Sequence, residues 1–435
     1  MTENNLFSPV QHGFVAGKSC CTQLLEVMED LTEALDNGKD VDMVYLDFCK
    51  AFDKVPHRRL LTKVWGYGIR GKVYIWIKEF LSNRVQKVMV NGKGSDTAKV
   101  TSGIPQGSVL GPILFLIFIN DLPEVIQASI KLFADDAKIY QIVSSEEDIN
   151  QFQENINRAV NWSKTWQMFY NTAKCKHLHV GSHDQNQEYT MTTSEEPIST
   201  TITKVDREKD LGVVVDKSLK FTEHIDSKIK LANRNLGLIF RTFTFLDKEI
   251  FLNLYKSLVR PHLEYAATVW SPVYKKDKIA IENVQRRATK LVKNISHMSY
   301  SERLKILGLP SLEYRRERAD VIQVYKILHE IDKIDKEKLF TVARYTSTRG
   351  HSLKLYKYRS RLNVRANSFS NRVVEPWNSL PESIVQAPSL NCFKSRLNKW
   401  WSDHPYKFTP ACYDPGKPTR DYYTRKRPEE AEMPE

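Results

Sequence analysis

The sequence contains no apolar run long enough to cross a membrane as a helix. Its longest, residues 109–119 (VLGPILFLIFI), contains Gly111 and Pro112, whereas a membrane-spanning helix needs roughly 20 apolar residues. A buried helix is expected there instead. The first 13 residues lack a basic segment followed by an apolar one, so they predict no secretory signal. We therefore expect a protein of the nucleus or cytoplasm that is not secreted and has no membrane partner.

Cysteine is scarce, with 6 residues in 435. The cysteines form no CxxC pair and have no histidine at the spacing of a zinc site, which excludes the common zinc modules. We expect free thiols. No internal repeat with a period of roughly 20 to 50 residues is visible, which excludes a solenoid.

Apolar residues and charges of both signs are plentiful. The apolar fraction of 41% is high enough to form packed cores, and the length predicts more than one module, since single cores seldom exceed roughly 250 to 300 residues. Basic residues outnumber acidic ones by 65 to 52, a net charge of +13. This excess favours a polyanionic partner such as nucleic acid.

The two halves of the chain show different patterns. Up to about residue 220, short β-rich runs alternate with helical periods. Three features stand out there: a strand over Val41–Phe48, a hairpin around Asn91-Gly92, and a helix opened by a capping box at Ser144 and Glu147. Beyond that point the pattern is mainly helical, with predicted helices at Ile225–Phe245, Lys248–Val269 and Asp277–Asn294.

Asp47 ends an apolar strand, MVYLDF, that is otherwise expected to be buried. A carboxylate held there costs several kcal/mol unless it meets a cation or a metal ion. Asp47 is therefore a candidate site residue. The alternative is a strand-end aspartate that caps the next helix.

Asp135 and Asp136 join two β-rich runs in IKLFADDAKIYQIV. Hairpin turns prefer Asn-Gly or Asp-Gly, and adjacent carboxylates repel each other, so turn geometry alone does not favour this pair. A divalent cation removes the repulsion, and together with Asp47 the three carboxylates can hold two Mg²⁺ ions. The alternative is a solvated acidic turn.

A glycine-rich segment, SGIPQGSVLGP (Ser102–Pro112), lies between these carboxylates in the sequence. Glycines let a backbone approach a ligand closely, Pro105 stiffens the loop, and Ser108 can cap the helix that follows. Such a loop at the start of a helix suits a phosphate or a nucleotide.

Basic segments follow in the second half. Lys354–Arg365 interleaves lysine and arginine with Tyr356 and Tyr358. Four cations are expected on one helix face: Arg286, Arg287, Lys290 and Lys293. Phosphate neutralisation combined with stacking suits an RNA template or an RNA–DNA hybrid. A solvated charged face is the alternative.

Five segments carry a resemblance to the reverse transcriptase family, in the family's order. They are YLDFCKAFD (Tyr45–Asp53), SGIPQGSVLGP (Ser102–Pro112), FADD (Phe133–Asp136), WQMFYNTAK (Trp166–Lys174) and DLGVVVD (Asp210–Asp216). More narrowly, the chain resembles the polymerase of non-LTR (LINE) retrotransposons of the jockey and CR1-like kind, from Gln11 to about Trp401. The resemblance implies an RNA-directed DNA polymerase that uses an RNA template, a DNA primer and deoxynucleoside triphosphates.

The resemblance also implies which residues perform the reaction. Asp47 and Asp135 would be the principal ligands of two Mg²⁺ ions, or of Mn²⁺, with Asp136 beside them. Lys174 would neutralise or protonate the leaving pyrophosphate. An exposed lysine in a basic loop is the alternative for Lys174.

Substrate contacts are implied in the same way. Phe52 would be the aromatic gate that disfavours a 2′-hydroxyl on the incoming nucleotide. Gln106 and Gly107 would line the nucleotide pocket. Leu211 and Gly212 would form the turn that steadies the primer strand.

The implied fold class is α+β: a right-hand polymerase palm with an antiparallel sheet and partial fingers, followed by an α-helical thumb and a C-terminal module. The expected domains are remnant fingers (1–40), palm (41–220), thumb (221–300), a basic C-terminal module (301–403) and a disordered tail (404–435). The oligomeric state is not predicted.

The sequence departs from the family in several places. The upstream endonuclease and the early basic fingers segment of such elements are missing, so we expect an N-terminally truncated relative. Val15 stands where relatives often have Arg, and Cys49 and Ala137 replace a usual Ser and Thr. Two other functions stay open: a catalytically silent, nucleic-acid-binding remnant of such an element, and a maturase-like splicing cofactor.

Overall fold

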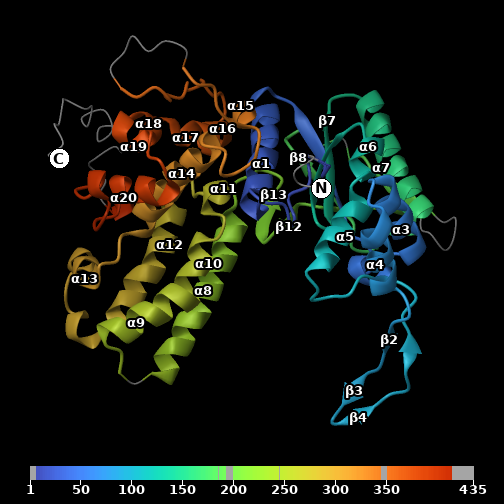
Figure 1. The fold of residues 1–435 in the computed structure, drawn as a ribbon. Helices are drawn as coiled ribbons and strands as arrows, with labels where there is room; N and C mark the ends of the chain where they lie inside the picture. Colours follow the sequence, from blue (N-terminus) through green and yellow to red (C-terminus); the bar gives the residue numbers. More distant parts are fainter. Residues whose placement is uncertain (1–5, 185, 193–198, 244, 344–349, 414–435) are drawn as a thin grey trace. The chain divides into compact units, whose positions relative to one another are not determined.

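The computed structural model describes residues 6–184, 186–192, 199–243, 245–343 and 350–413. The chain divides into two compact units (Figure 1). Unit 1 comprises Met1–Gln23 and Gly38–Glu208, and unit 2 comprises Leu24–Asn37 and Lys209–Glu435. The fold class is α+β, as predicted. Within the described ranges, no helix combines the length and the apolar composition that a membrane crossing requires.

Unit 1 is built on a five-stranded sheet with the order β11-β8-β1-β7-β6. The central strand β1 (Asp40–Leu46) pairs antiparallel with β7 (Asp136–Val143) on one side and with β8 (Lys176–Val180) on the other. At the edges, β6 (Ser129–Phe133) pairs antiparallel with β7, and β11 (Thr203–Val205) lies parallel to β8. The predicted strand over Val41–Phe48 is therefore the centre of the sheet.

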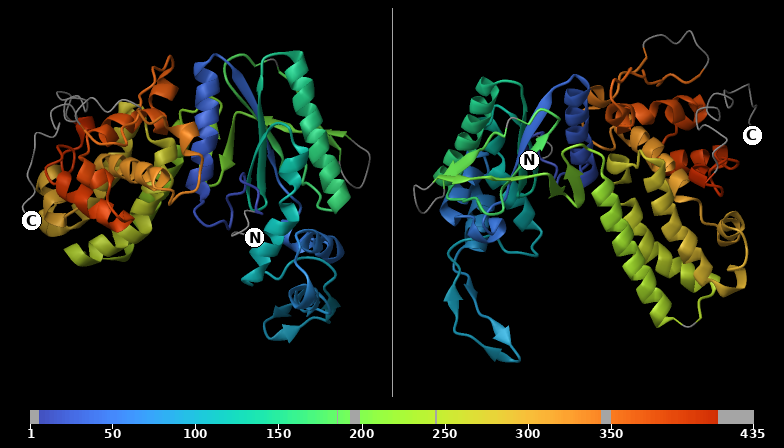
Figure 2. Two further views of the ribbon diagram at one scale, coloured as in Figure 1. Left: turned by 45° about the horizontal axis from the view of Figure 1, so that its top comes forward. Right: turned by 180° about the vertical axis from the view of Figure 1, so that it is seen from behind.

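One face of this sheet packs against helices. Side chains alternate along a strand, so Val44 and Leu46 point to the same face, where they join a buried apolar cluster with Phe115 and Phe152. The helix expected in the longest apolar run is α5 (Leu110–Ile119), and it is buried as predicted. Figure 2 shows the long helix α7 running beside the sheet. The other helices of this unit are α2 (Ala51–Lys54), α3 (His57–Gly66), α4 (Gly71–Leu81) and α6 (Leu122–Val125).

Helix α7 (Glu146–Trp166) begins with a capping box that lies one residue later than predicted. Its N-cap is Ser145, whose Oγ accepts a hydrogen bond of 3.2 Å from the backbone N–H of Asp148. The Asp148 carboxylate in turn accepts from the backbone N–H groups of Ser144 and Ser145, at 2.9 and 3.0 Å. The capping box is therefore formed by Ser145 and Asp148 rather than by the predicted Ser144 and Glu147. The Asp148 carboxylate accepts from both backbone N–H groups that precede the helix.

The predicted hairpin around Asn91-Gly92 is confirmed. Both turn residues have positive φ, 49° and 80°, as a tight two-residue hairpin turn requires. The paired strands are β2 (Val85–Gln86) with β5 (Ala98–Lys99) and β3 (Met89–Val90) with β4 (Lys93–Gly94). In Figures 1 and 2 the hairpin projects away from the sheet of unit 1.

Unit 2 is mainly helical, and α8 (Thr222–Thr242) lies against α12 (Lys275–Ala288) (Figures 1 and 2). The single helix predicted over Lys248–Val269 is wrong, because the segment is divided. It contains α9 (Lys248–Leu254), a π-helical turn (Tyr255–Val259), α10 (Arg260–Glu264) and α11 (Ala267–Trp270). Pro261 has no N–H to donate, which interrupts the helical bonding, and Ala266 adopts φ 51° before α11.

Helix α12 ends at Ala288, earlier than predicted. Val292, with φ −79° and ψ 97°, is extended and stops the helical path. The four cations predicted on one helix face therefore belong to three elements, which is a correction. Arg286 and Arg287 lie in α12, Lys290 lies in the 3₁₀ turn Thr289–Leu291, and Lys293 lies in the 3₁₀ turn Lys293–Ile295.

Helix α1 (Cys20–Asp36) has most of its residues in unit 2, although the sequence groups it with residues 1–40. The buried Glu29 carboxylate accepts hydrogen bonds from Arg365 Nη2 at 2.7 Å and from Ser370 Oγ at 2.6 Å. The remaining helices of unit 2 are α13 (Tyr300–Leu307), α14 (Leu312–Leu328), α15 (Lys336–Leu339), α16 (Asn363–Ala366), α17 (Phe369–Arg372), α18 (Val374–Asn378), α19 (Glu382–Val385) and α20 (Leu390–Trp400).

Residues 404–413, expected to begin a disordered tail, pack within unit 2. His404, Tyr406 and Cys412 are buried, and Ser311 Oγ donates a hydrogen bond of 2.6 Å to the Tyr406 carbonyl. The prediction of disorder relied on the average composition of residues 404–435, which is rich in charge and proline. That average does not reveal that a few residues near the start of the segment are buried. Residues 414–435, the rest of the expected tail, lie outside the described residues.

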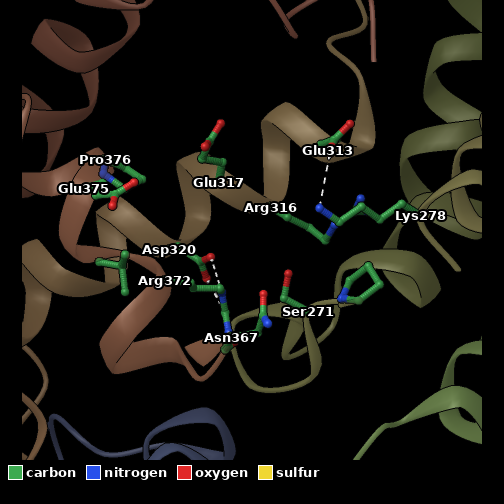
Figure 3. Close-up of a pocket in the computed structure, with 12 residues that line it drawn as sticks. Ser271, Lys278, Glu313, Arg316, Glu317, Asp320, Asn367, Arg372, Glu375 and Pro376 are labelled. Atoms are coloured by element: carbon green, nitrogen blue, oxygen red, sulfur yellow. Dashed lines mark hydrogen bonds and ion pairs between the residues drawn. The ribbon is translucent and has the colours of Figure 1, made fainter. Parts of the chain in front are cut away.

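A polar cavity of about 240 Å³ lies beside α14 in unit 2 (Figure 3). On one wall Arg372 makes two hydrogen bonds to the Asp320 carboxylate, at 2.8 and 2.9 Å. On another wall Lys278 Nζ lies 3.5 Å from the Glu313 carboxylate. Opposite charges thus line the cavity in pairs.

Candidate active site

Asp47 directly follows β1, and the segment beyond it holds it at the end of the sheet. Its carbonyl accepts a hydrogen bond of 2.7 Å from the backbone N–H of Asn171. The next residue, Phe48, stacks on Tyr170 with ring centroids 4.5 Å apart. The N-cap of helix α2 is Lys50, with no side-chain cap. The structure therefore does not support the alternative that Asp47 caps the next helix.

Asp135 lies in the tight turn Ala134-Asp135 between β6 and β7, where Phe133 pairs with Asp136. The turn is thus one residue earlier than the predicted Asp135-Asp136 turn, because Asp136 is already paired in the sheet. Burial raises the pKa of Asp135 above its usual value, and the nearby negative charge of Asp47 raises it further. Asp135 and Asp47 therefore lie close enough for their charges to interact. Asp136 is exposed at the start of β7.

Lys174 completes a group of charges at this end of the sheet. Its Nζ lies 3.7 Å from Asp47 Oδ1, and its side chain is 66% exposed against 40% for Asp47. The backbone N–H of Lys174 donates to the Asn171 carbonyl at 2.9 Å, which closes the turn before β8. The structure therefore brings together Asp47, Asp135 and Lys174, with Asp136 beside them.

The glycine-rich loop is bound to the segment that follows Asp47. The backbone N–H of Gly103 donates to the Val55 carbonyl at 2.9 Å, and Gln106 Nε2 donates to Asp53 Oδ1 at 2.7 Å. A Cβ atom at Gly103 would lie 2.5 Å from the Asp53 carbonyl oxygen, and its φ is +88°. Glycine is required there because both the space and the backbone conformation exclude a side chain.

Phe52 and Gly107 occupy the same region. The Phe52 ring stacks on Phe115 with centroids 4.4 Å apart and an interplanar angle of 18°, and its carbonyl accepts from the backbone N–H of Ile104 at 2.8 Å. Gly107 has φ +79°, and the space that its Cβ would occupy is open. Ser108 Oγ accepts a bond of 3.0 Å from the Gly111 N–H, which stabilises the start of α5.

Leu211 and Gly212 form a tight turn, as predicted, between β12 (Arg207–Asp210) and β13 (Val213–Asp216). Both have positive φ, 44° and 87°. The Tyr265 hydroxyl donates a hydrogen bond of 2.9 Å to the Leu211 carbonyl. This turn belongs to unit 2, whereas the other predicted site residues belong to unit 1.

The carboxylates of this site fit a divalent cation in their chemistry. Among the residues that the structure describes, no three or more His, Cys, Asp or Glu side chains already form a metal-binding cluster. Even so, Asp47 and Asp135 are close enough for one to raise the pKa of the other, and a cation between them would relieve that repulsion. The ammonium of Lys174 already lies beside Asp47.

Two residues that support the site carried no sequence prediction. Asp53 accepts the hydrogen bond from the Gln106 amide. Gln11 Oε1 accepts a bond of 2.9 Å from the backbone N–H of Ala134, in the Asp135 turn. Both lie in the part of the chain that resembles the reverse transcriptase family. Their place in that part is the one sequence feature that could have indicated their role.

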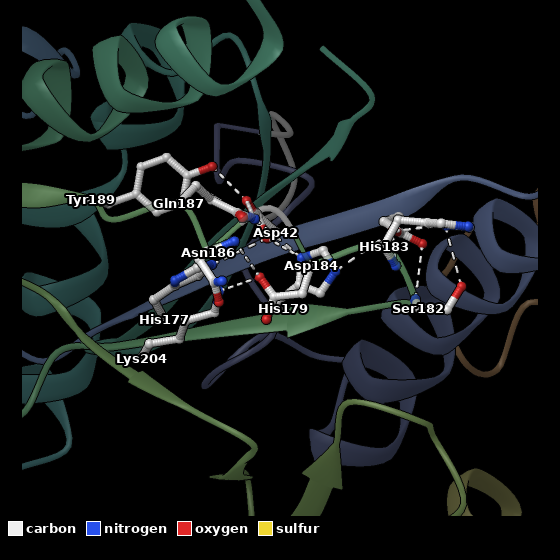
Figure 4. A network of polar contacts seen from close by, with 11 residues as sticks. Asp42, His177, His179, Ser182, His183, Asp184, Asn186, Gln187, Tyr189 and Lys204 are labelled. Carbon is white, nitrogen blue, oxygen red and sulfur yellow. Dashed lines mark hydrogen bonds and ion pairs between the residues drawn. The ribbon is translucent and has the colours of Figure 1, made fainter. Parts of the chain in front are cut away.

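A second polar network lies inside unit 1, around the fully buried Asp42 (Figure 4). Its carboxylate meets His179 Nδ1 at 2.7 Å and His177 Nε2 at 3.2 Å, and it accepts from Gln187 and Tyr189, each at 2.5 Å. Burial alone would raise the pKa of Asp42, but its contacts with His177 and His179 hold that pKa well below the usual range. Because Asp42 is fully buried, its carboxylate is not accessible to a substrate.

Comparison with known proteins identifies the family. Residues 1–221 match the family described as reverse transcriptase (RNA-dependent DNA polymerase), which is just over half of the 435-residue chain. The chain therefore belongs to the reverse transcriptase family, as the resemblance implied.

Three of its similar proteins come from mobile elements. The RNA-directed DNA polymerase from mobile element jockey of Drosophila melanogaster is 26% identical over 91% of this chain and 39% of that protein. The jockey polymerase of Drosophila funebris is 30% identical over 60% of this chain and 29% of that protein. The probable RNA-directed DNA polymerase from transposon X-element of Drosophila melanogaster is 25% identical over 65% of this chain and 31% of that protein. The chain thus spans well under half of the length of these relatives.

Among solved structures, apo telomerase from Candida tropicalis is similar with a TM-score of 0.35 and 11% identity. The similarity covers 93% of this chain and 56% of that chain. Telomerase from Candida albicans bound to a telomeric RNA fragment has a TM-score of 0.33, over 66% of this chain and 52% of that chain.

Proposed function

We propose that this chain is the RNA-directed DNA polymerase of a non-LTR retrotransposon, which extends a DNA primer on an RNA template from deoxynucleoside triphosphates. The observation that carries the proposal is the meeting of Asp47, Asp135 and Lys174 at one end of the sheet in unit 1, in a member of the reverse transcriptase family. Two carboxylates that interact with each other beside a lysine form a site suited to cations and phosphates.

In this proposal Asp47 and Asp135 would be the main ligands of Mg²⁺, with Asp136 beside them. Bound Mg²⁺ or Mn²⁺ would activate the primer 3′-hydroxyl and offset the charge of the triphosphate. Lys174 supplies a positive charge, and a proton at Nζ, to the leaving pyrophosphate. Its exposure allows the side chain to reach a substrate from its place beside Asp47.

The incoming nucleotide contacts the glycine-rich loop that precedes α5. The bond between Gln106 and Asp53 fixes the Gln106 amide, and the open space at Gly107 lets the backbone approach a ligand. Phe52, held by its stack on Phe115, excludes a 2′-hydroxyl. The turn at Leu211 and Gly212, fixed by its bond from Tyr265, steadies the primer strand.

The remaining segments contact nucleic acid. Residues 41–220 act as palm, 221–300 as thumb and 301–403 as a basic module, with residues 1–40 supplying part of the fingers. Tyr356 and Tyr358 have exposed rings in a segment rich in lysine and arginine, which suits stacking next to phosphates. The protein works in the nucleus or cytoplasm, where its RNA and nucleotides are found.

Primer extension tests the proposal. The purified chain is given an RNA template, an annealed DNA primer, deoxynucleotides and Mg²⁺. We expect incorporation that EDTA abolishes and that Asp47→Asn lowers by about 100-fold or more, whereas the exposed control Asp96→Asn keeps the original rate. The absence of incorporation by a folded chain that still binds the hybrid would overturn the proposal and favour a silent nucleic-acid-binding protein.

A further inference from the structure

We infer that Gln11 is a positioning residue that holds the Asp135 turn in the geometry that the polymerase reaction needs. The inference deepens the proposed function and rests on it. Gln11 lies more than 120 positions from Asp135 in the sequence, and it acts through the turn rather than on a substrate.

The side chain of Gln11 makes two hydrogen bonds from a buried position. The residue is 1% exposed, and its Oε1 accepts from the backbone N–H of Gly13 at 2.8 Å and from that of Ala134 at 2.9 Å. Both partners are donors, so the side-chain atom that faces them must be the oxygen. A single amide group thus connects the start of the chain to the turn.

Backbone hydrogen bonds from the residues on either side of Gln11 also connect this segment to β6. The N–H of His12 donates to the Leu132 carbonyl at 2.8 Å, and the N–H of Leu132 donates to the Val10 carbonyl at 3.0 Å. At Gly13, a Cβ atom would lie closer to the backbone nitrogen of Ala134 than real Cβ contacts allow. The segment therefore packs directly on the turn.

The turn needs such support because of its conformation. Ala134 has φ 54°, a left-handed conformation that costs a non-glycine residue roughly 1 kcal/mol or more. A buried backbone N–H also requires an acceptor, and the Gln11 oxygen supplies one to Ala134. With this acceptor in place, the next residue, Asp135, is held in the turn between β6 and β7, at the start of β7.

Three substitutions isolate the effect. Gln11→Met keeps the shape of the side chain but removes the acceptor, and Gln11→Glu keeps an acceptor oxygen. The matched control is Gln23→Met, since Gln23 is fully buried in the same unit and its side chain has no hydrogen bond within the described part of the chain. Thermal unfolding of each variant confirms that it is folded.

Two measurements decide the outcome. Hydrogen exchange, followed by mass spectrometry on a peptide spanning residues 132–137, reports the turn without reference to activity. We expect faster exchange in this peptide for Gln11→Met, and a kcat for primer extension lowered by roughly 10- to 100-fold with KM for the nucleotide nearly unchanged. Gln11→Glu should recover the slow exchange because it keeps the acceptor oxygen, and Gln23→Met should change neither the exchange nor kcat.

The results separate this inference from the proposed function. Unchanged exchange or unchanged kcat in Gln11→Met would overturn the role of Gln11 while leaving the polymerase intact. A kcat lost equally in Gln11→Met and Gln23→Met would also overturn it, because any buried substitution would then have the same effect. If the unsubstituted chain incorporates nothing, the proposed function fails, and with it the catalytic role of Gln11.

Discussion

The ammonium of Lys174 lies 3.7 Å from the carboxylate of Asp47, although well over a hundred residues separate them in the chain. The pairing of β1 with β8 produces this contact. Tyr45 lies opposite Lys176 in the antiparallel ladder, so the residues just beyond that pair, Asp47 and Lys174, meet at the end of the sheet. The contact is a consequence of strand register rather than of local sequence.

Replacing Lys174 by alanine should slow nucleotide transfer without unfolding the protein. Its side chain is largely exposed, so its removal changes stability little, whereas loss of a charge at the leaving pyrophosphate should lower kcat by about 100-fold. Pre-steady-state incorporation measures this. Lys176→Ala is the control, because Lys176 Nζ donates to the Ala173 carbonyl instead. An equal loss of kcat in both variants would contradict the assigned role.

Replacing Phe52 by valine should weaken selection against ribonucleotides. The stack on Phe115 holds the ring in place, and a smaller side chain leaves room for a 2′-hydroxyl. We expect the ratio of kcat/KM for a deoxynucleotide to that for the matching ribonucleotide to fall by about 10-fold or more. An unchanged ratio, with incorporation intact, would show that Phe52 does not face the sugar.

Stability should depend on pH through His179. Burial alone would lower its pKa, but its hydrogen bond to Asp42 raises the pKa above the usual value. A group whose pKa is raised on folding stabilises most below its unfolded pKa of about 6.5, and that stabilisation is lost as the pH rises through the folded value. The lowered pKa of Asp42 acts in the opposite sense, because its stabilisation is lost only in acid, below about pH 4.

Urea unfolding measures this dependence. We expect the free energy of unfolding to be lower at pH 9 than at pH 6 through His179, and His179→Gln should remove that difference. The control is His183→Gln, because His183 is exposed and lies beside Asp40. This variant should keep the difference in free energy of unfolding between the two pH values. A difference that survives in His179→Gln would assign the effect to another group.

Removing Arg372 should destabilise unit 2, because it leaves the buried Asp320 carboxylate without its cation (Figure 3). We expect Arg372→Met to lower the free energy of unfolding by about 3 to 5 kcal/mol. The double variant Arg372→Met/Asp320→Leu should recover most of the lost free energy of unfolding, because no buried charge is then left without a partner. The more exposed pair of Lys357 and Glu375 serves as control, since Lys357→Met should cost less than about 1 kcal/mol. Equal losses for the two pairs would contradict the role of burial.

Local patterns predicted the elements that carry the site. An apolar, β-rich run ending in a carboxylate predicted β1 and Asp47, and Asn91-Gly92 predicted its hairpin, because these signals depend on neighbouring residues alone. The helix over Lys248–Val269 was predicted too long, since the apolar period continues through Pro261 and the break at Ala266.

Long-range partners explain what the sequence did not predict. The turn before β7 has positive φ at Ala134 rather than at a glycine or asparagine, and its support comes from Gln11, which is 123 positions earlier in the sequence. Helix α1 contributes to unit 2 because Glu29 pairs with Arg365. No local pattern reports such contacts, because each partner lies more than a hundred residues away.

The central claim is that Asp135 belongs to a working polymerase site. The most direct test is deoxynucleotide incorporation on a poly(rA) template primed with oligo(dT), in Mg²⁺, for the unsubstituted chain and for Asp135→Asn, which keeps the shape of the side chain and removes its charge. We predict clear incorporation by the unsubstituted chain and a loss of about 100-fold or more in Asp135→Asn, with hybrid binding retained by both. Equal incorporation by the two proteins, or none by either while both bind the hybrid, would contradict the claim.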